Sequence, residues 1–133
     1  MKKTDTINVS GKRKTATARA TLKKGKGKVK VNGRFLDYFG DEVSKLRIKE
    51  PLVLAGDVAK KVDISVSVNG GGINGQSDAV RLAIARALVV HDPKLKAVFD
   101  EYDRLLLVAD VRRKEVCKPN VSKARKKRQK SYR

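Results

Sequence analysis

The sequence predicts an α+β fold, a two-layer sandwich in which helices pack on an antiparallel-rich sheet, with an extended basic C-terminal tail. Segments 15–23 (TATARATLK) and 62–69 (VDISVSVN) alternate apolar and polar residues, as strands with one buried face do. Segment 76–92 repeats apolar residues every three or four positions, which indicates an amphipathic helix. This patterning is lost beyond residue 111. We therefore expect one globular domain at residues 1–111 and a tail at residues 112–133.

Three strands are expected near the N-terminus, at residues 5–9, 15–23 and 29–31. The alternate residues of the second strand are three alanines and a leucine, so a closely packed layer is expected on that side. Basic turns join the strands, and Asn32-Gly33 marks a further turn because both residues tolerate positive φ. We predict a three-stranded antiparallel meander.

The region that follows the third strand is predicted to be helical. Residues 34–42 and 43–57 form two short pieces, punctuated by Gly40 and Pro51, and Gly56 closes the second piece. This assignment places two helical elements between the third and fourth strands.

The second half of the domain begins with the strand at 62–69 and the helix at 76–92. A short helix is expected at 95–104, and the apolar run at 105–110 is predicted to be a buried final strand. The element order is therefore three strands, two short helices, a strand, two helices and a strand.

The charge is concentrated at the two ends of the chain. The formal net charge is +19. Residues 1–36 hold twelve basic side chains against one acid, residues 113–133 hold ten against one, and residues 37–112 hold eleven against twelve. Such ends attract polyanions, of which nucleic acid is the commonest. A membrane surface is disfavoured because neither end pairs a basic face with a broad apolar face on one helix.

Other classes of function lack the residues they need. The chain has one histidine and one cysteine, so an internal disulfide is impossible and a metal site is not expected. The opening MKKTDTINVS has no apolar stretch typical of a signal peptide, and arginines interrupt the longest apolar window. We expect no cofactor, no small-molecule substrate and no membrane association.

A glycine-rich turn, NGGGINGQSD, lies between the strand at 62–69 and the long helix. Its glycines fit GxGxxG, but no lysine follows the last glycine and the preceding strand alternates, so a tight turn is favoured over a nucleotide loop. Either Asn74 or Ser77 is expected to cap the helix. The residues able to contact a phosphate here are Gly70, Gly71, Gly72, Gly75 and Gln76.

The C-terminal tail is the strongest signal for RNA. Seven of its last eleven residues are Lys or Arg, and no apolar run ties it to a core, so it should order only along phosphates. A nuclear-localisation signal would look similar, and Tyr132 could stack on an unpaired base. The cations expected on RNA are Lys12, Arg13, Lys14, Arg19, Lys26, Lys28, Arg112, Arg113, Lys123, Arg125, Lys126, Lys127 and Arg128.

Three stretches carry a resemblance to a known family. GKRKTATARATL (11–22), GGGINGQSDAVRLAIARAL (70–88) and the closing QKSYR (129–133) occur in this order. Together they resemble the ninth protein family of the small ribosomal subunit, in its archaeal and eukaryotic branch. The resemblance spans nearly the whole chain.

The resemblance implies a fold, a location and partners. The fold would be that of the second domain of the small-subunit S-five protein, with a left-handed crossover. The protein would be cytoplasmic, in the head of the small subunit, among other head proteins and on ribosomal RNA. The tail would reach transfer RNA in the P site through Lys130, Ser131, Tyr132 and Arg133, and no catalysis would be expected.

Two other functions stay open on the residues alone. A small nucleotide-dependent kinase could use the glycine turn, although no base or nearby lysine supports it. A free RNA chaperone or RNA-processing factor would have the same composition, and only the family resemblance argues against it.

Overall fold

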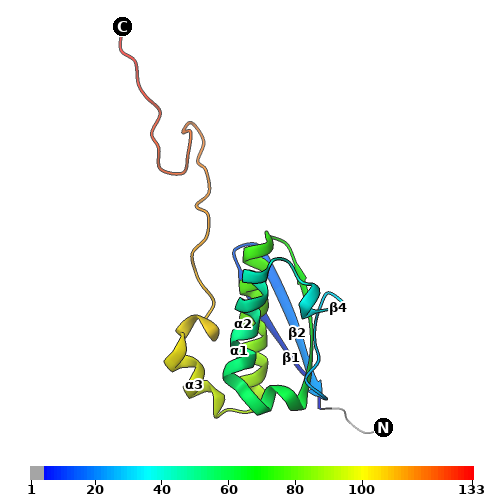
Figure 1. Cartoon of the computed structure of the whole chain (residues 1–133). Coiled ribbons are helices and arrows are strands. Elements are labelled where there is room, and N and C mark those ends of the chain that lie inside the picture. The colour runs from blue at the N-terminus through cyan, green and yellow to red at the C-terminus, as the bar shows by residue number, and fades with distance from the viewer. Residues whose placement is uncertain (1–4) are drawn as a thin grey trace.

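The computed structural model describes residues 5–133; whatever was predicted for residues 1–4 lies outside it. Five strands form one mixed sheet in the order β1-β2-β5-β3-β4, and the helices cover one of its faces (Figure 1). The strands are β1 (Ile7–Arg13), β2 (Ala16–Lys24), β3 (Val29–Val31), β4 (Arg34–Phe35) and β5 (Val62–Asn69). The helices are α1 (Glu42–Ala55), α2 (Ile73–His91) and α3 (Leu95–Tyr102), with short 3-10 turns η1 (Leu36–Tyr38), η2 (Gly56–Lys61) and η3 (Arg104–Leu106). The predicted α+β class is confirmed.

The core lies between α2 and the strands β1, β2 and β5. The alternating residues of β2 and β5 that were predicted to be buried are all buried. Gly11 of β1 brings the helix closest, because a Cβ built there would lie 2.5 Å from the Ala79 carbonyl oxygen of α2. Small residues on both layers thus allow the close packing that the alanines of β2 predicted.

The predicted meander is wrong in its third strand. β3 pairs with β5 in parallel, whereas β1, β2 and β5 form consecutive antiparallel pairs. The position beside β2 is occupied by β5, and the loop after β2 crosses the start of β5, where Gly25 N–H donates to Lys61 O (2.9 Å). The turn at Asn32-Gly33 is confirmed, with φ of 51° and 80°, and it joins β3 to β4.

The region between β4 and β5 is also organised differently from the prediction. Of residues 34–42, only η1 and the start of α1 are helical, whereas α1 runs through Pro51 without a break. The N-cap of the helix is Asp41, whose carboxylate accepts from Ser44 N–H (3.2 Å), and the helix packs on α2. This packing offsets the single hydrogen bond that a helical proline cannot donate. Gly56 ends the helix with φ of 58°, as predicted.

The predicted final strand at 105–110 is absent. The segment forms η3 and then irregular chain, and only Leu106 is fully buried. The side chain of Arg86 lies between this segment and β1, where it donates to Ser10 O (3.0 Å) and to Leu107 O (3.1 Å). The Arg86 guanidinium thus bridges β1 and this segment, in place of the backbone hydrogen bonds that would join two paired strands.

The long helix starts earlier than predicted. Gly72 is its N-cap and offers no side-chain hydrogen bond. Ser77 Oγ instead donates to Asn74 O (2.8 Å) inside the first turn, so neither predicted capping residue caps the helix. Within the described part of the chain, no helix is long and apolar enough to cross a membrane.

Candidate nucleic-acid interface

The uncovered face of the sheet is polar and basic. Residues directly opposite each other in the ladder share a face, so the register places Lys12 beside Thr17, Ser10 beside Arg19, and Arg19 beside Ser67. Lys23 and Lys30 belong to the same face, through Asp63 and Ser65. We call this surface the open face, and its main members are Lys12, Thr17, Arg19, Thr21, Lys23, Lys30, Ser65, Ser67 and Asn69. Its cations and hydroxyl groups suit phosphate and ribose oxygens.

A lysine-rich loop borders the open face. The Asp63 carboxylate of β5 accepts the backbone N–H groups of Lys26 and Lys28, each at 2.9 Å. These hydrogen bonds hold the pKa of Asp63 below its ordinary value. A groove of about 530 Å³ lies beside the loop, lined by Thr21, Lys23, Lys28, Lys30, Asp63, Ile64 and Ser65. The acid on this face therefore serves to hold the loop, and leaves the lysine side chains exposed.

Lys23 and Lys30 also belong to this surface, although neither is among the cations that the sequence led us to expect on RNA. The missing information was the partner of β3, because only pairing with β5 brings Lys30 into line with Ser65 and Thr21, on the same face as Arg19. The alternation of side chains along a strand shows which face each residue occupies within its own strand. It could not show that the two strands share a sheet through β5.

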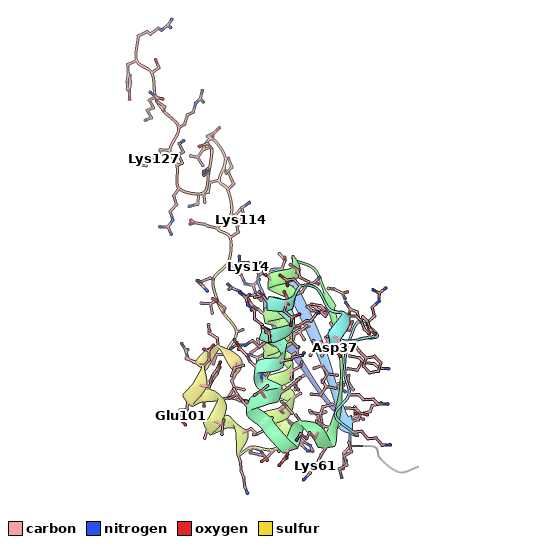
Figure 2. All side chains as sticks on the ribbon, viewed as in Figure 1. Lys14, Asp37, Lys61, Glu101, Lys114 and Lys127 are labelled. Atoms are coloured by element: carbon pink, nitrogen blue, oxygen red, sulfur yellow. The ribbon has the colours of Figure 1, made fainter. Side chains whose placement is uncertain are left out.

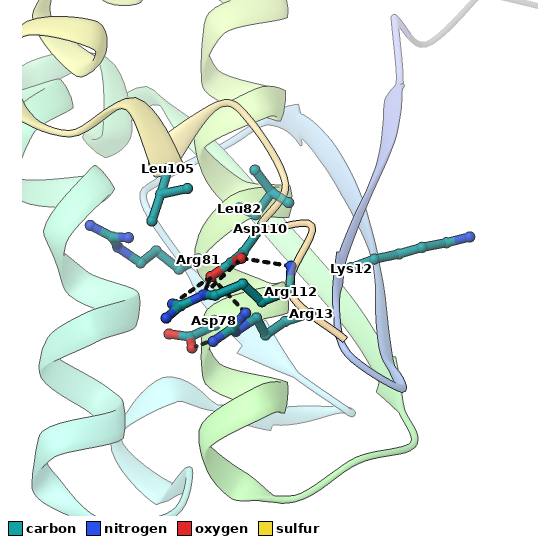
Figure 3. Close-up of a pocket in the computed structure, with 8 residues that line it drawn as sticks. All are labelled: Lys12, Arg13, Asp78, Arg81, Leu82, Leu105, Asp110 and Arg112. Atoms are coloured by element: carbon teal, nitrogen blue, oxygen red, sulfur yellow. Dashed lines mark hydrogen bonds and ion pairs between the residues drawn. The ribbon is translucent and has the colours of Figure 1, made fainter. Parts of the chain in front are cut away.

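Arg13 lies on the opposite side of the sheet from its neighbour Lys12. It pairs with Ala16 across the ladder, on the side that the helices cover, and its side chain is only 17% exposed. Its Nη1 atom lies 2.6 Å from Asp110 Oδ2, and its Nε lies 3.6 Å from Asp78 Oδ2. Figure 3 shows Lys12 pointing away from this group, while Arg13 and Arg112 converge on the two carboxylates.

Asp110 marks the root of the tail. Its carboxylate accepts from the side chain of Arg112 (2.7 Å) and from the Arg112 backbone N–H (3.0 Å). These hydrogen bonds, with the charges of Arg112 and Arg13, lower the pKa of Asp110 to about 2. The carboxylate thus remains ionised at any physiological pH.

The pH dependence of this contact follows from the lowered pKa. Because the folded-state pKa lies below the ordinary 3.8, the stabilisation by Asp110 is fully present above pH 3.8 and is lost as the pH falls towards about 2. We expect the difference in unfolding free energy between the wild type and Asp110→Asn to be constant from pH 7 to pH 4. It should shrink below pH 4. Denaturant unfolding at each pH measures it, and an Asp110 carboxyl carbon that titrates near 4 by NMR would contradict it.

The tail has no helix or strand and runs away from the sheet and helices (Figures 1 and 2). Near its root, Arg113 Nη1 donates to Lys14 O (3.2 Å). Further on, Arg125 donates to Glu115 (2.8 Å) and closes a loop around Asn120, whose φ is 63°. The remaining tail cations are exposed: Lys114, Lys118, Lys123, Lys126, Lys127, Arg128, Lys130 and Arg133.

The tip of the tail carries its aromatic residue outward. Tyr132 is 88% exposed, and Ser131 and Arg133 beside it are exposed as well. An exposed aromatic ring next to cations is a suitable surface for stacking on an unpaired base.

The glycine turn is a tight turn that packs on the β1–β2 hairpin. Gly70 and Gly71 have φ of 78° and 66°, and a Cβ at Gly70 would lie 2.6 Å from Thr15 O. The Gln76 side chain donates to Gly70 O (3.1 Å) and closes the turn. A hollow of about 390 Å³ lies at the start of α2, lined by Arg13, Lys14, Arg47, Asn74, Gly75, Asp78 and Arg112. The phosphate-contacting role predicted for this turn stays a prediction.

The described residues contain no group of three or more His, Cys, Asp or Glu that could hold a metal ion.

Comparisons with known proteins agree on one family. The family model described as Ribosomal protein S9/S16 matches residues 11–133. Three archaeal relatives, each described as small ribosomal subunit protein uS9, are similar to this chain. The Thermoplasma acidophilum protein is 52% identical over 126 residues, covering 93% of this chain and 98% of its own length. The Thermoplasma volcanium protein is 50% identical over 131 residues, covering 97% and 99%. The Pyrobaculum aerophilum protein is 50% identical over 125 residues, covering 92% and 88%.

Proposed function

Because the chain belongs to the ribosomal protein S9/S16 family, a family of structural ribosomal proteins and not of enzymes, we propose that it binds ribosomal RNA in the head of the small subunit. The family is one of ribosomal proteins and the relatives are small-subunit proteins, which supports a proposed location in the small ribosomal subunit of the cytoplasm. Its role there is placement and charge neutralisation, without chemistry. We also propose that the fold is that of the second domain of the small-subunit S-five protein. The chain would then consist of a globular domain at 1–111 and a tail at 112–133.

One observation supports the RNA proposal above the others. The molecule has two basic surfaces, and both lie away from the helical layer. The open face and the lysine-rich loop present one surface, and the tail presents the other. The helical layer mixes both charge signs, since Asp37, Glu42 and Glu50 each pair with a cation. RNA phosphates would therefore contact the sheet and tail, and other head proteins the helices.

The cations that the sequence led us to expect on ribosomal RNA differ in how accessible they are. Arg13 is covered and held by two carboxylates, whereas Arg112 and Arg125 are exposed and hold one each. Exposed ion pairs are weak, so both can exchange their carboxylates for phosphate. The others have exposed side chains: Lys12, Lys14, Arg19, Lys26, Lys28, Arg113, Lys123, Lys126, Lys127 and Arg128. The glycine turn, with Gly70, Gly71, Gly72, Gly75 and Gln76, is proposed as a backbone contact to phosphate.

Co-sedimentation tests the proposal. A cell lysate washed in high salt is separated on a sucrose gradient, and the protein is followed by immunoblot. We expect it with the small subunit at about one copy per particle. A protein that stays at the top of the gradient would instead be a free RNA chaperone or processing factor.

The proposed role of the tip is contact with transfer RNA in the P site, through Lys130, Ser131, Tyr132 and Arg133. Deletion of residues 129–133 is expected to leave assembly of the subunit intact and to weaken P-site transfer RNA binding, because all four side chains are exposed and hold nothing in the domain. Filter binding of transfer RNA to programmed subunits measures the loss. A subunit that fails to assemble would show that the tip is structural, and unchanged binding would remove the proposed contact.

A further inference from the structure

The segment that leads into the tail, residues 107–113, is tied to the rest of the domain at three successive points. Leu107 O accepts from Arg86 of α2 (3.1 Å), Asp110 faces Arg13 of β1 (2.6 Å), and Arg113 donates to Lys14 O in the β1–β2 turn (3.2 Å). The first and third contacts end on backbone carbonyls. Only the second joins two opposite charges, and it lies between the other two along the chain.

The central contact is shielded from solvent. The side chains of Arg13 and Asp110 are 17% and 13% exposed, whereas that of Arg112, which contacts the same carboxylate oxygen, is 76% exposed. A cavity of only about 110 Å³ adjoins them, lined by Lys12, Arg13, Asp78, Arg81, Leu82, Leu105, Asp110 and Arg112 (Figure 3). An ion pair that is partly withdrawn from water is screened less by salt than a surface pair.

Arg13 is therefore placed differently from the other cations of its motif. Lys12 projects from the open face, but Arg13 points to the helical side, where Asp78 and Asp110 occupy its guanidinium. A phosphate would have to displace two carboxylates and find a way past the tail root to reach it. Of these two neighbouring cations, Lys12 is therefore free to contact a polyanion, whereas Arg13 is engaged by carboxylates of its own chain.

We propose that Arg13, with Asp110 and Asp78, forms a clamp that fixes the direction in which the basic tail leaves the domain. Arg13 is a positioning residue in this arrangement and contacts no RNA. Without the clamp, the tail would pivot near Leu107; with it, the mobile chain begins after Arg113. The clamp exists in the free protein, so its test does not depend on the proposed ribosomal function.

The test is the backbone ¹⁵N order parameters of the free, full-length protein. For residues 108–113 we expect values of about 0.85 in the wild type, as in rigid backbone, and below about 0.6 in Arg13→Gln. Lys12→Gln is the matched control, because it removes the same charge one residue away and should leave the root rigid. Asp110→Asn should loosen the root as Arg13→Gln does, and the double variant should add nothing further.

RNA binding separates positioning from contact. The slope of log affinity against log salt should become shallower by about 1 in Lys12→Gln, which loses a phosphate contact, and should stay unchanged in Arg13→Gln. A rigid root in Arg13→Gln, together with the shallower slope, would overturn the clamp and make Arg13 an RNA contact. If Arg13→Gln disturbs the sheet, Asp110→Asn decides, since a root that stays rigid in that variant also overturns the proposal.

Discussion

Replacement of Gly11 by alanine is expected to lower the free energy of unfolding by about 3 kcal/mol, the upper part of the range for overpacked cores. The added Cβ would lie 2.5 Å from Ala79 O and 2.8 Å from Ala83 N, both backbone atoms of α2. Backbone atoms of a buried helix cannot rotate away as a side chain can. The sheet and helix must separate, and contacts along the whole β1–α2 layer weaken. Urea unfolding followed by circular dichroism measures the change.

Gly72→Ala is the matched control for this prediction. Its φ is −101°, and a Cβ there meets nothing within 4 Å, so the loss should stay below about 1 kcal/mol. Equal losses at the two positions would mean that the close approach of the helix is not what makes alanine unfavourable at Gly11, because the effect of alanine on the unfolded chain is stabilising at both positions.

Neutralising the end of the tail is expected to have the largest effect on RNA binding. Residues 123–133 hold seven cations, and only Arg125 has a carboxylate partner among the tail contacts described above. Replacing all seven with glutamine should make the slope of log affinity against log salt shallower by about 5 to 6, at 0.7–0.9 for each phosphate contact. Filter binding of a small-subunit RNA fragment between 50 and 200 mM salt measures the slope.

A length-matched control distinguishes the effect of the tail's charge from the effect of the order of its residues. A tail with the same seven cations in shuffled order should keep the wild-type slope, because phosphate neutralisation carries no sequence information. An unchanged slope in the glutamine variant would assign RNA binding to the open face alone. A reduced slope in the shuffled variant would mean that the path of the tail, and not only its charge, is recognised.

The one acidic side chain of the tail, Glu115, affects this measurement in a predictable way. Glu115 holds Arg125 at 2.8 Å and Lys118 at 3.3 Å in exposed surroundings. Because such exposed ion pairs contribute little to stability in water, the loop they close can open when RNA phosphates compete for the two cations. The clamp at Asp110 is more shielded, so binding should reorganise the tail beyond Glu115 and leave its root in place.

Features that depend on neighbours along the chain were predictable from the sequence. The alternation in β2 and β5 gave their buried faces, and the spacing in α2 gave its apolar stripe, because both periods are properties of the local backbone. Net charge and its concentration at the two ends also needed no structure. The turn at Asn32-Gly33 and the end of α1 at Gly56 followed from residues that tolerate positive φ.

Tertiary structure alone decided which segments meet. The partner of β3, the absence of a strand at 105–110 and the continuation of α1 through Pro51 depend on packing that local patterns do not contain. The same holds for Lys12 and Arg13, which are adjacent, equally charged and part of one motif. The pleat of β1 sends them to opposite faces, and only the position of α2 and the tail root makes one of them a surface cation and the other a largely covered partner of Asp110.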